Sequence, residues 1–461
     1  MFFVPIGRMP FHRESAAPSI RPSRGVFAAL LVLVLIAGAL PARAVTLIRD
    51  PDIEHALARL AEPVLTASGL GSQVRVLVVD DGSLNAFVLD NQHIFIHLGM
   101  LLRLDTPQAL QAVIAHEAAH IANGHIARRI TNMGYAQSAA SLGVALALAV
   151  AAATGESSAA AGIALGTATS AQRRFLAHTR AEEVAADQSG LRYLSIGGVD
   201  PSGALEVHRL FQGQEMLNTA RQDPYMRSHP LTGDRLRAVQ AYVDAQTGKA
   251  APQPESRYWF ERARGKAQGF SRSAKWTLRR APDAISEDIR AMMEAAAYLK
   301  LADWRRAEAR IDRALAIRPD DPFYHELKGQ ILLESRQYDA AVAAYGRAVD
   351  LAPDNALCLA GYGHALLAAK RHRAALAALE KARARDFRDS RLLRDLGQAY
   401  AHDGQPGMAA LATAERYALQ GRLKDAEIHA RRASGLLPRG SGGWRRAEDI
   451  LLAARRAENK R

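Results

Sequence analysis

The chain has 461 residues, of which 49% are apolar, 23% charged and 6% aromatic, and its formal net charge is +13. This balance is typical of a folded, alanine-rich, mainly helical protein rather than a disordered one, and the length favours about two or three domains. The positive charge allows attraction to anionic surfaces, but the arginines are scattered and no nucleic-acid recognition motif is present. The sequence therefore predicts a solvated basic surface and no nucleic-acid partner.

Cys358 is the only cysteine in the chain. A single thiol excludes a disulfide within the chain and a thiolate cage around a metal, so any zinc must be bound by histidines and carboxylates. Cys358 stands among leucines of a repeated helix and is interpreted as a small buried hydrophobic residue.

Residues 1–44 are predicted to be a signal peptide. Several arginines precede an unbroken apolar run over residues 26–40, and Ala42-Arg43-Ala44 follows it. The run is shorter than the roughly 20 residues of a membrane span, and the A-x-A pattern indicates cleavage after Ala44. An uncleaved N-terminal membrane anchor is the alternative. In both cases the body of the protein is expected to be exported.

Three short segments with strand composition follow, at residues 74–79, 85–89 and 93–98, and they predict a small β-sheet. Thr106-Pro107 then supplies an N-cap and a proline at the first helical position. The helix that begins there carries His116 and His120.

Residues 139–169 consist almost wholly of Ala, Gly, Leu, Val and Ser, and a polar stretch divides them into two halves. Each half is too short to cross a bilayer, so the segment predicts a helical hairpin near the active-site mouth. Shallow membrane contact or a role as a substrate lid is the functional alternative to a purely structural hairpin.

A further helix is predicted over residues 171–194, and it carries Glu183 and Asp187. The first domain is expected to cover residues 45–245. Residues 246–290 are rich in Pro, Gly and Arg without a clear long period, and they are interpreted as a linker.

An internal repeat occupies residues 291–440. Gly329, Gly363 and Gly397 are separated by 34 residues, and alanines recur with the same step, from Ala307 and from Ala314. A 34-residue period with small residues at helix crossings is typical of tetratricopeptide repeats, which stack into a solenoid. Residues 414–438 form a further unit outside the strict register, and residues 441–461 are expected to form a C-terminal helix or tail.

The sequence His116-Glu117-Ala118-Ala119-His120 is an HExxH motif. Histidines four residues apart on a helix point the same way and can bind one ion, with the glutamate between them as general base. A catalytic zinc needs one more protein ligand and one open position. The motif predicts one Zn2+ per chain and a zincin-type metallopeptidase domain in a mainly α fold with a small β-sheet.

The third ligand is not another histidine of the motif, because a histidine of the HExxHxxGxxH type would stand where the chain has Ile126. His125 is one residue out of place for that role. A carboxylate from a second helix is the alternative: Glu183 and Asp187 lie four residues apart on one helical face, so that Glu183 can bind the metal while Asp187 orients a histidine.

These residues resemble the zinc metallopeptidases related to the CaaX prenyl endopeptidases. The resemblance covers about residues 80–245 and is carried by Asn85-Ala86-Phe87, HEAAH with Asn123-Gly124-His125, Glu183-x-x-x-Asp187, and Ser228-His229-Pro230 with Arg235. With the leader and the repeats, the whole chain is similar to periplasmic members that act as protease and chaperone in outer-membrane β-barrel assembly.

The resemblance implies a role for each matching residue. Glu183 becomes the third ligand, His229 a histidine that can cap the metal in a latent state or assist at the transition state, and Arg235 its partner. Asn85, Ala86 and Phe87 resemble the edge strand that pairs with substrate backbone. The family's membrane-embedded members have several spanning helices that this chain lacks, so prenylated substrates are not expected.

The expected function is therefore an exported, periplasmic zinc endopeptidase that acts on misfolded or stalled envelope proteins. Its repeats are expected to hold outer-membrane proteins or their assembly machinery. The alternative is a non-proteolytic chaperone or adaptor that keeps a structural zinc and acts through its repeats.

Overall fold

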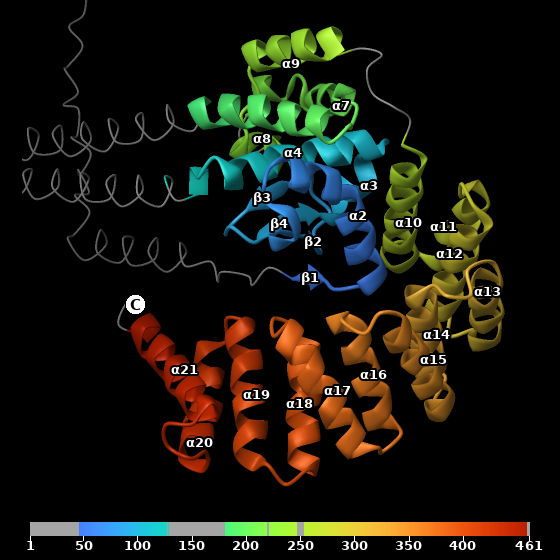
Figure 1. Ribbon diagram of the computed structural model, residues 1–461, viewed down its shortest axis with the longest axis vertical. Helices are drawn as coiled ribbons and strands as arrows, with labels where there is room; N and C mark the ends of the chain where they lie inside the picture. Colours follow the sequence, from blue (N-terminus) through green and yellow to red (C-terminus); the bar gives the residue numbers. More distant parts are fainter. Residues whose placement is uncertain (1–45, 127, 129–179, 219–220, 247–252, 459–461) are drawn as a thin grey trace, which may run out of the picture. The chain divides into compact units, whose positions relative to one another are not determined.

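The computed structural model describes residues 46–126, 128, 180–218, 221–246 and 253–458. The expected signal peptide over residues 1–44 and the expected hairpin over residues 139–169 lie outside these residues. Within the described part the chain is mainly helical and has one four-stranded sheet, which confirms the predicted fold class (Figure 1). None of the described helices has the length and apolar character needed to cross a membrane.

The sheet has the strand order β1-β2-β4-β3, so β3 lies at an edge. The strand β4 pairs in parallel with β2 and antiparallel with β3, and β1 pairs antiparallel with β2. The three predicted strands are present, whereas the two-residue β1 is too short to give a pattern. The bounds are Leu47–Ile48 for β1, Arg75–Val79 for β2, Ala86–Val88 for β3 and His93–His97 for β4.

The helix α4, Pro107–Ala122, is almost entirely buried and lies between the sheet and α7 (Figure 1). Its N-cap is the predicted one, because the Thr106 hydroxyl accepts a hydrogen bond from the Ala109 amide at 3.1 Å. The surrounding helices are α2, Pro51–Ala67; α3, Leu98–Arg103; α7, Ser202–Phe211; α8, Pro224–Ser228; and α9, Gly233–Gln246. The helix α2 was not among the predicted elements, although Asp50-Pro51 carries the same cap signal as Thr106-Pro107.

The prediction of a linker over residues 246–290 is wrong for most of that range. It contains α10, Pro254–Ser271, and α11, Ala274–Arg280, and it runs into α12, Glu287–Lys300. The glycines that suggested a linker serve close helix packing instead: a Cβ at Gly269 would lie 2.9 Å from the Cβ of Ala296. Composition alone does not distinguish a helix crossing from a flexible connection.

Antiparallel helix pairs follow, with small residues at their crossings. Ala307, Ala341 and Ala375, which mark the 34-residue step, are each fully buried. The helices are α13, Trp304–Ile317; α14, Pro322–Glu334; α15, Tyr338–Leu351; α16, Ala356–Ala368; α17, His372–Arg385; α18, Ser390–His402; α19, Pro406–Leu419; α20, Leu423–Leu436; and α21, Gly442–Glu458.

Buried ion pairs connect the first repeats to the N-terminal part of the chain. The Arg262 guanidinium on α10 is fully buried; its Nε lies 2.7 Å from Asp52 on α2, and two of its nitrogens lie 2.6 and 2.8 Å from Asp321, the N-cap of α14. A second group joins Arg49 to Asp386 at 2.6 Å. The Arg262 contacts join α2, α10 and α14, and the Arg49 contact joins the segment before α2 to the C-cap of α17.

Next to Arg262, the buried Lys266 ammonium lies 3.6 Å from Asp50, 3.9 Å from Asp52 and 3.9 Å from Glu326. Burial raises the pKa of Glu326 to about 7, and the negative charges of Asp50 and Asp52 act in the same direction against the opposing charge of Lys266. The folded protein therefore binds a proton at Glu326 more tightly than the unfolded chain does.

Glu326→Gln is expected to flatten the pH dependence of stability. A carboxyl whose pKa is raised on folding stabilises the protein fully at low pH, and this stabilisation is lost as the pH rises from about 4.5 through about 7. The wild type should lose free energy of unfolding relative to Glu326→Gln between pH 5 and pH 8, measured by urea denaturation. Glu334→Gln, an exposed change in the same helix, is the control. Parallel pH profiles for wild type and Glu326→Gln would contradict the prediction.

Candidate metal centre

The helix α4 carries both histidines of the HExxH motif on its buried surface. His116 and His120 are 7% and 0% exposed, and their Nε2 atoms lie 3.1 Å apart. Four residues correspond to slightly more than one helical turn, so the two rings project from neighbouring turns toward one point. The helix thereby presents two nitrogen atoms that are close enough together to bind the same ion.

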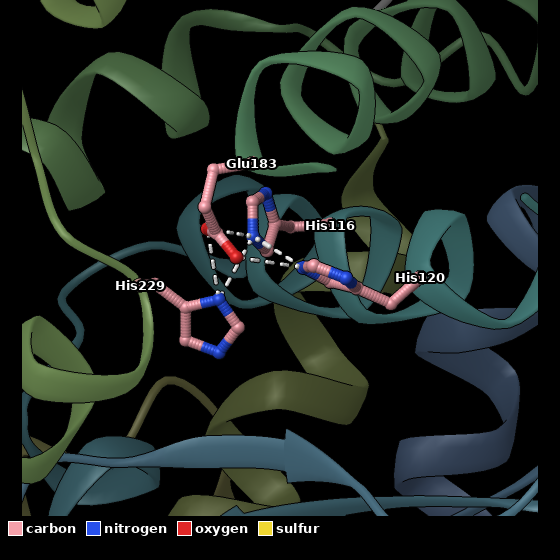
Figure 2. Close-up of side chains that lie close together, drawn as sticks. All are labelled: His116, His120, Glu183 and His229. Atoms are coloured by element: carbon pink, nitrogen blue, oxygen red, sulfur yellow. Dashed lines mark hydrogen bonds and ion pairs between the residues drawn. The ribbon is translucent and has the colours of Figure 1, made fainter. Parts of the chain in front are cut away.

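Two further side chains reach this point from other segments (Figure 2). Glu183, on the helix described from residue 180 to 196, places Oε2 3.2 Å from Nε2 of His116 and Oε1 3.4 Å from Nε2 of His120. His229, just after α8, places Nδ1 3.0 Å from Oε2 of Glu183. The ligand atoms of these four buried residues all lie within 4.8 Å of one another.

Asp187 lies one turn after Glu183 and contacts the other nitrogen of His116, with 3.1 Å between its Oδ1 and Nδ1 of the ring. Arg235 holds Asp187 with two hydrogen bonds, at 2.6 Å to Oδ2 and 2.8 Å to Oδ1. The same guanidinium donates to the carbonyl of Pro230 at 2.8 Å, next to His229. Arg235 therefore connects the acid that orients His116 with the loop that carries His229.

The electrostatics of the site favour a positive charge. Burial alone would lower the pKa of His116, but hydrogen bonds and charges from Asp187 and Glu183 outweigh it and raise this pKa to about 10. Burial opposes ionisation of Glu183, yet the charge of His229 and hydrogen bonds from His116 and His229 hold the pKa of Glu183 well below its usual value. One carboxylate, from Glu183, and three imidazoles in this arrangement are a donor set that fits zinc, with Asp187 supporting His116 from outside.

Glu117 is fully buried beside these donors, and neither of its carboxylate oxygens accepts a hydrogen bond from any described residue. His229 lies close to it, with 3.4 Å between its Nε2 and Oε1 of Glu117. A buried carboxylate without hydrogen bonds costs free energy, and such groups are found where a ligand, water or reacting group is to be bound.

The predicted substrate strand corresponds to β3 and the residue before it. Ala86 and Phe87 lie in β3, at the sheet edge that faces no other described strand, and β3 contacts α4. The amide nitrogen of the Asn85 side chain lies 3.5 Å from Nε2 of His97. The carbonyl of Leu84 accepts a hydrogen bond from the Tyr225 amide at 3.1 Å, which ties the strand to the helix that precedes His229.

Three residues near the site were not predicted to belong to it. His125 contacts His120, the Tyr225 ring lies tilted against His229 with 4.7 Å between ring centroids, and His208 is buried 3.9 Å from Asp187. Burial, followed by the positive charges of Arg235 and His116, lowers the pKa of His208 to about 4 against the effect of Asp187. His125 stands inside the quoted motif, whereas no sequence signal distinguishes Tyr225 or His208.

Comparison with known proteins finds similar sequences for both the N-terminal part and the repeats. The model of peptidase family M48 matches residues 48–243, and a tetratricopeptide-repeat model matches residues 332–396. A relative from Vibrio cholerae serotype O1 is 26% identical over 286 residues, which cover 60% of this chain and 58% of that protein. The beta-barrel assembly-enhancing protease of Escherichia coli (strain K12) is 23% identical over 318 residues, which cover 66% of this chain and 63% of the relative.

The alignments thus span about three fifths of the length of these relatives. A solved structure, "MamA MSR-1 C2", is 18% identical and has a TM-score of 0.30 over 35% of this chain and 96% of that one, which is too low to support an inference. The family match covers every residue of the metal centre described above. Between residues 48 and 243 the chain therefore carries a domain of peptidase family M48, and tetratricopeptide repeats follow it.

Proposed function

We propose that this protein is a zinc-dependent endopeptidase. The observation that carries the proposal is the meeting of His116, His120 and Glu183 at one point, with the buried carboxylate of Glu117 beside them. Glu183 stands 67 residues from His116 in the sequence, so its placement within 3.2 Å of the ring is a product of the fold. The match to a peptidase family supports the same conclusion.

His116, His120 and Glu183 would hold the zinc, which when bound polarises the scissile carbonyl and lowers the pKa of a water molecule. Glu117 would accept the proton of the attacking water and deliver it to the leaving amine, because its oxygens are not engaged in other hydrogen bonds. Asp187, held by Arg235, would keep the proton of His116 on Nδ1, so that Nε2 stays available as a donor.

The family resemblance implies two possible roles for His229, and its position near the proposed ligands is compatible with the first. Its Nδ1 lies 3.2 Å from Nε2 of His116, so it can occupy a fourth ligand position and hold the enzyme in a latent state. Turned toward the substrate, the same ring can support the transition state. The edge of β3 that pairs with no other described strand could take up an extended substrate, with Asn85, Ala86 and Phe87 as the contacting residues.

The substrates that we propose are misfolded or stalled proteins of the cell envelope, and the repeats would hold outer-membrane proteins or their assembly machinery. The named relative and the presence of stacked helix pairs after the peptidase domain support this proposal. The proposal places the protein in the periplasm. Contact of residues 139–169 with a membrane surface is a separate hypothesis, which flotation of the protein with liposomes tests.

Removal of the metal is the direct test of the enzyme. The purified chain should contain about one zinc ion, lose casein cleavage on treatment with a chelator, and recover it when zinc is added back. Metal analysis of the treated and restored samples accompanies the assay. A chain that remains free of metal after careful reconstitution, or that cleaves casein equally well without it, would overturn the proposal.

A further inference from the structure

His125 lies against the outer nitrogen of a proposed zinc ligand. Its Nδ1 is 2.9 Å from Nδ1 of His120, and both side chains are almost completely buried, with 1% and 0% of their surface exposed. The inner nitrogen of His120, Nε2, is the one that lies within 3.4 Å of Glu183. His125 therefore contacts the side of the ring that points away from the metal position.

The contact between His125 and His120 is possible because the helix is interrupted between them. On a continuous helix a residue five positions after His120 would lie about 140° around the axis and could not meet it. The chain instead leaves α4 after Ala122, and Gly124 takes the left-handed conformation with φ +69°. The turn is held to the helix of Glu183, because the side-chain amide of Asn123 donates to the Ser189 hydroxyl at 3.1 Å.

We propose that His125 is a positioning residue that fixes the tautomer of His120 for metal binding, an inference that rests on the proposed zinc site. A neutral imidazole carries one proton, so Nε2 can donate a lone pair to a metal only when the proton is on Nδ1. Nδ1 of His125 accepts that proton in a hydrogen bond, and His125 then carries its own proton on Nε2. The ring of His120 is thereby held in the orientation that directs Nε2 into the site.

The two metal-binding histidines thus have different outer partners. A carboxylate, from Asp187, lies against the outer nitrogen of His116, whereas an imidazole, from His125, lies against the outer nitrogen of His120 in a buried position. Outer partners of metal-bound histidines typically contribute about 10- to 100-fold in metal affinity. An effect of this size is expected for His125, even though it does not touch the metal.

The test is the zinc affinity of the full chain, measured by competition with a chromophoric chelator. His125→Phe keeps a buried ring without an acceptor and should weaken zinc binding about 10- to 100-fold. His125→Asn places an oxygen near the position of Nδ1 and should recover most of the affinity. His125→Leu should behave like His125→Phe and provides the same comparison if the larger ring does not fit.

The matched control is His93→Phe, which replaces another buried histidine, on β4, that contacts Asp90 rather than a proposed ligand. It should bind zinc as the wild type does. Unfolding of the metal-free variants shows whether the fold is intact, and the visible spectrum of the Co2+-loaded chain should change with His125→Phe and return with His125→Asn. Equal zinc affinity for wild type and His125→Phe, or equal losses with Phe and Asn, would overturn the inference. A wild type that binds no zinc would overturn the proposed enzyme as well.

Discussion

Glu117→Gln is expected to keep the metal and to lower peptidase activity by about 10²–10⁴-fold, the usual contribution of general acid–base catalysis. Glutamine has nearly the same size as glutamate but cannot accept a proton from water. The fold should tolerate the change, because Glu117 is fully buried and neither of its oxygens accepts a hydrogen bond from the residues that the structure describes. Casein cleavage and zinc content, measured on the same sample, test this prediction.

The comparison variant is Glu183→Gln, which should lose activity together with zinc, because Glu183 is the proposed third ligand. The pair of variants separates a base from a ligand: only the change at Glu117 should leave the metal in place. Undiminished casein cleavage by Glu117→Gln would refute its role. The same variant in cells tests the alternative adaptor function, since an adaptor that acts only through its repeats should lose nothing when Glu117 is changed.

Arg262→Met is expected to lower the free energy of unfolding by about 3–5 kcal/mol, because removal of one partner from a buried ion pair leaves charges without compensation. Arg262 is fully buried and has hydrogen bonds to both Asp52 and Asp321. The variant would leave two carboxylates facing an apolar side chain between α2 and α14. Denaturation in guanidinium chloride, monitored by circular dichroism, gives the free energy.

Arg59→Met is the control for this prediction, because its ion pair with Glu255 is solvent-exposed and such pairs contribute about 0–1 kcal/mol. A variant in which Asp52 and Asp321 are also changed to Asn should be more stable than Arg262→Met alone, since no buried charge of that group is then left unpaired. A loss of less than about 1 kcal/mol for Arg262→Met would contradict the assigned role of the guanidinium.

The features that could be predicted from the sequence are those set by short-range geometry. The residues of the HExxH motif share a helical face because the helix repeats every 3.6 residues, and the cap at Thr106-Pro107 fixes where that helix begins. The strands β2, β3 and β4 could be predicted from the composition of their short segments. The 34-residue step of Gly329, Gly363 and Gly397 indicated stacked helix pairs.

The prediction of a linker over residues 246–290 is wrong because local sequence does not show which helix a glycine packs against. A glycine such as Gly269 in a segment rich in Pro, Gly and Arg suggests a flexible connection. In the fold, however, Gly269 allows α10 to approach Ala296 on α12. A glycine has the same local preferences in a connection and at a helix crossing, and only the neighbouring helix shows which of the two is present.

The sequence by itself determined the two histidines that we propose as zinc ligands, the glutamate between them and the repeat architecture, because spacing along one helix or one repeat is sufficient for each. The tertiary structure brings Glu183 and His229 to those histidines, as the family resemblance implied but local spacing could not show, and it alone places His125 against His120 across a broken helix end. These contacts join segments up to 113 residues apart. The distances between these side chains depend on how buried surfaces pack against one another, and local periodicity in the sequence does not determine that packing.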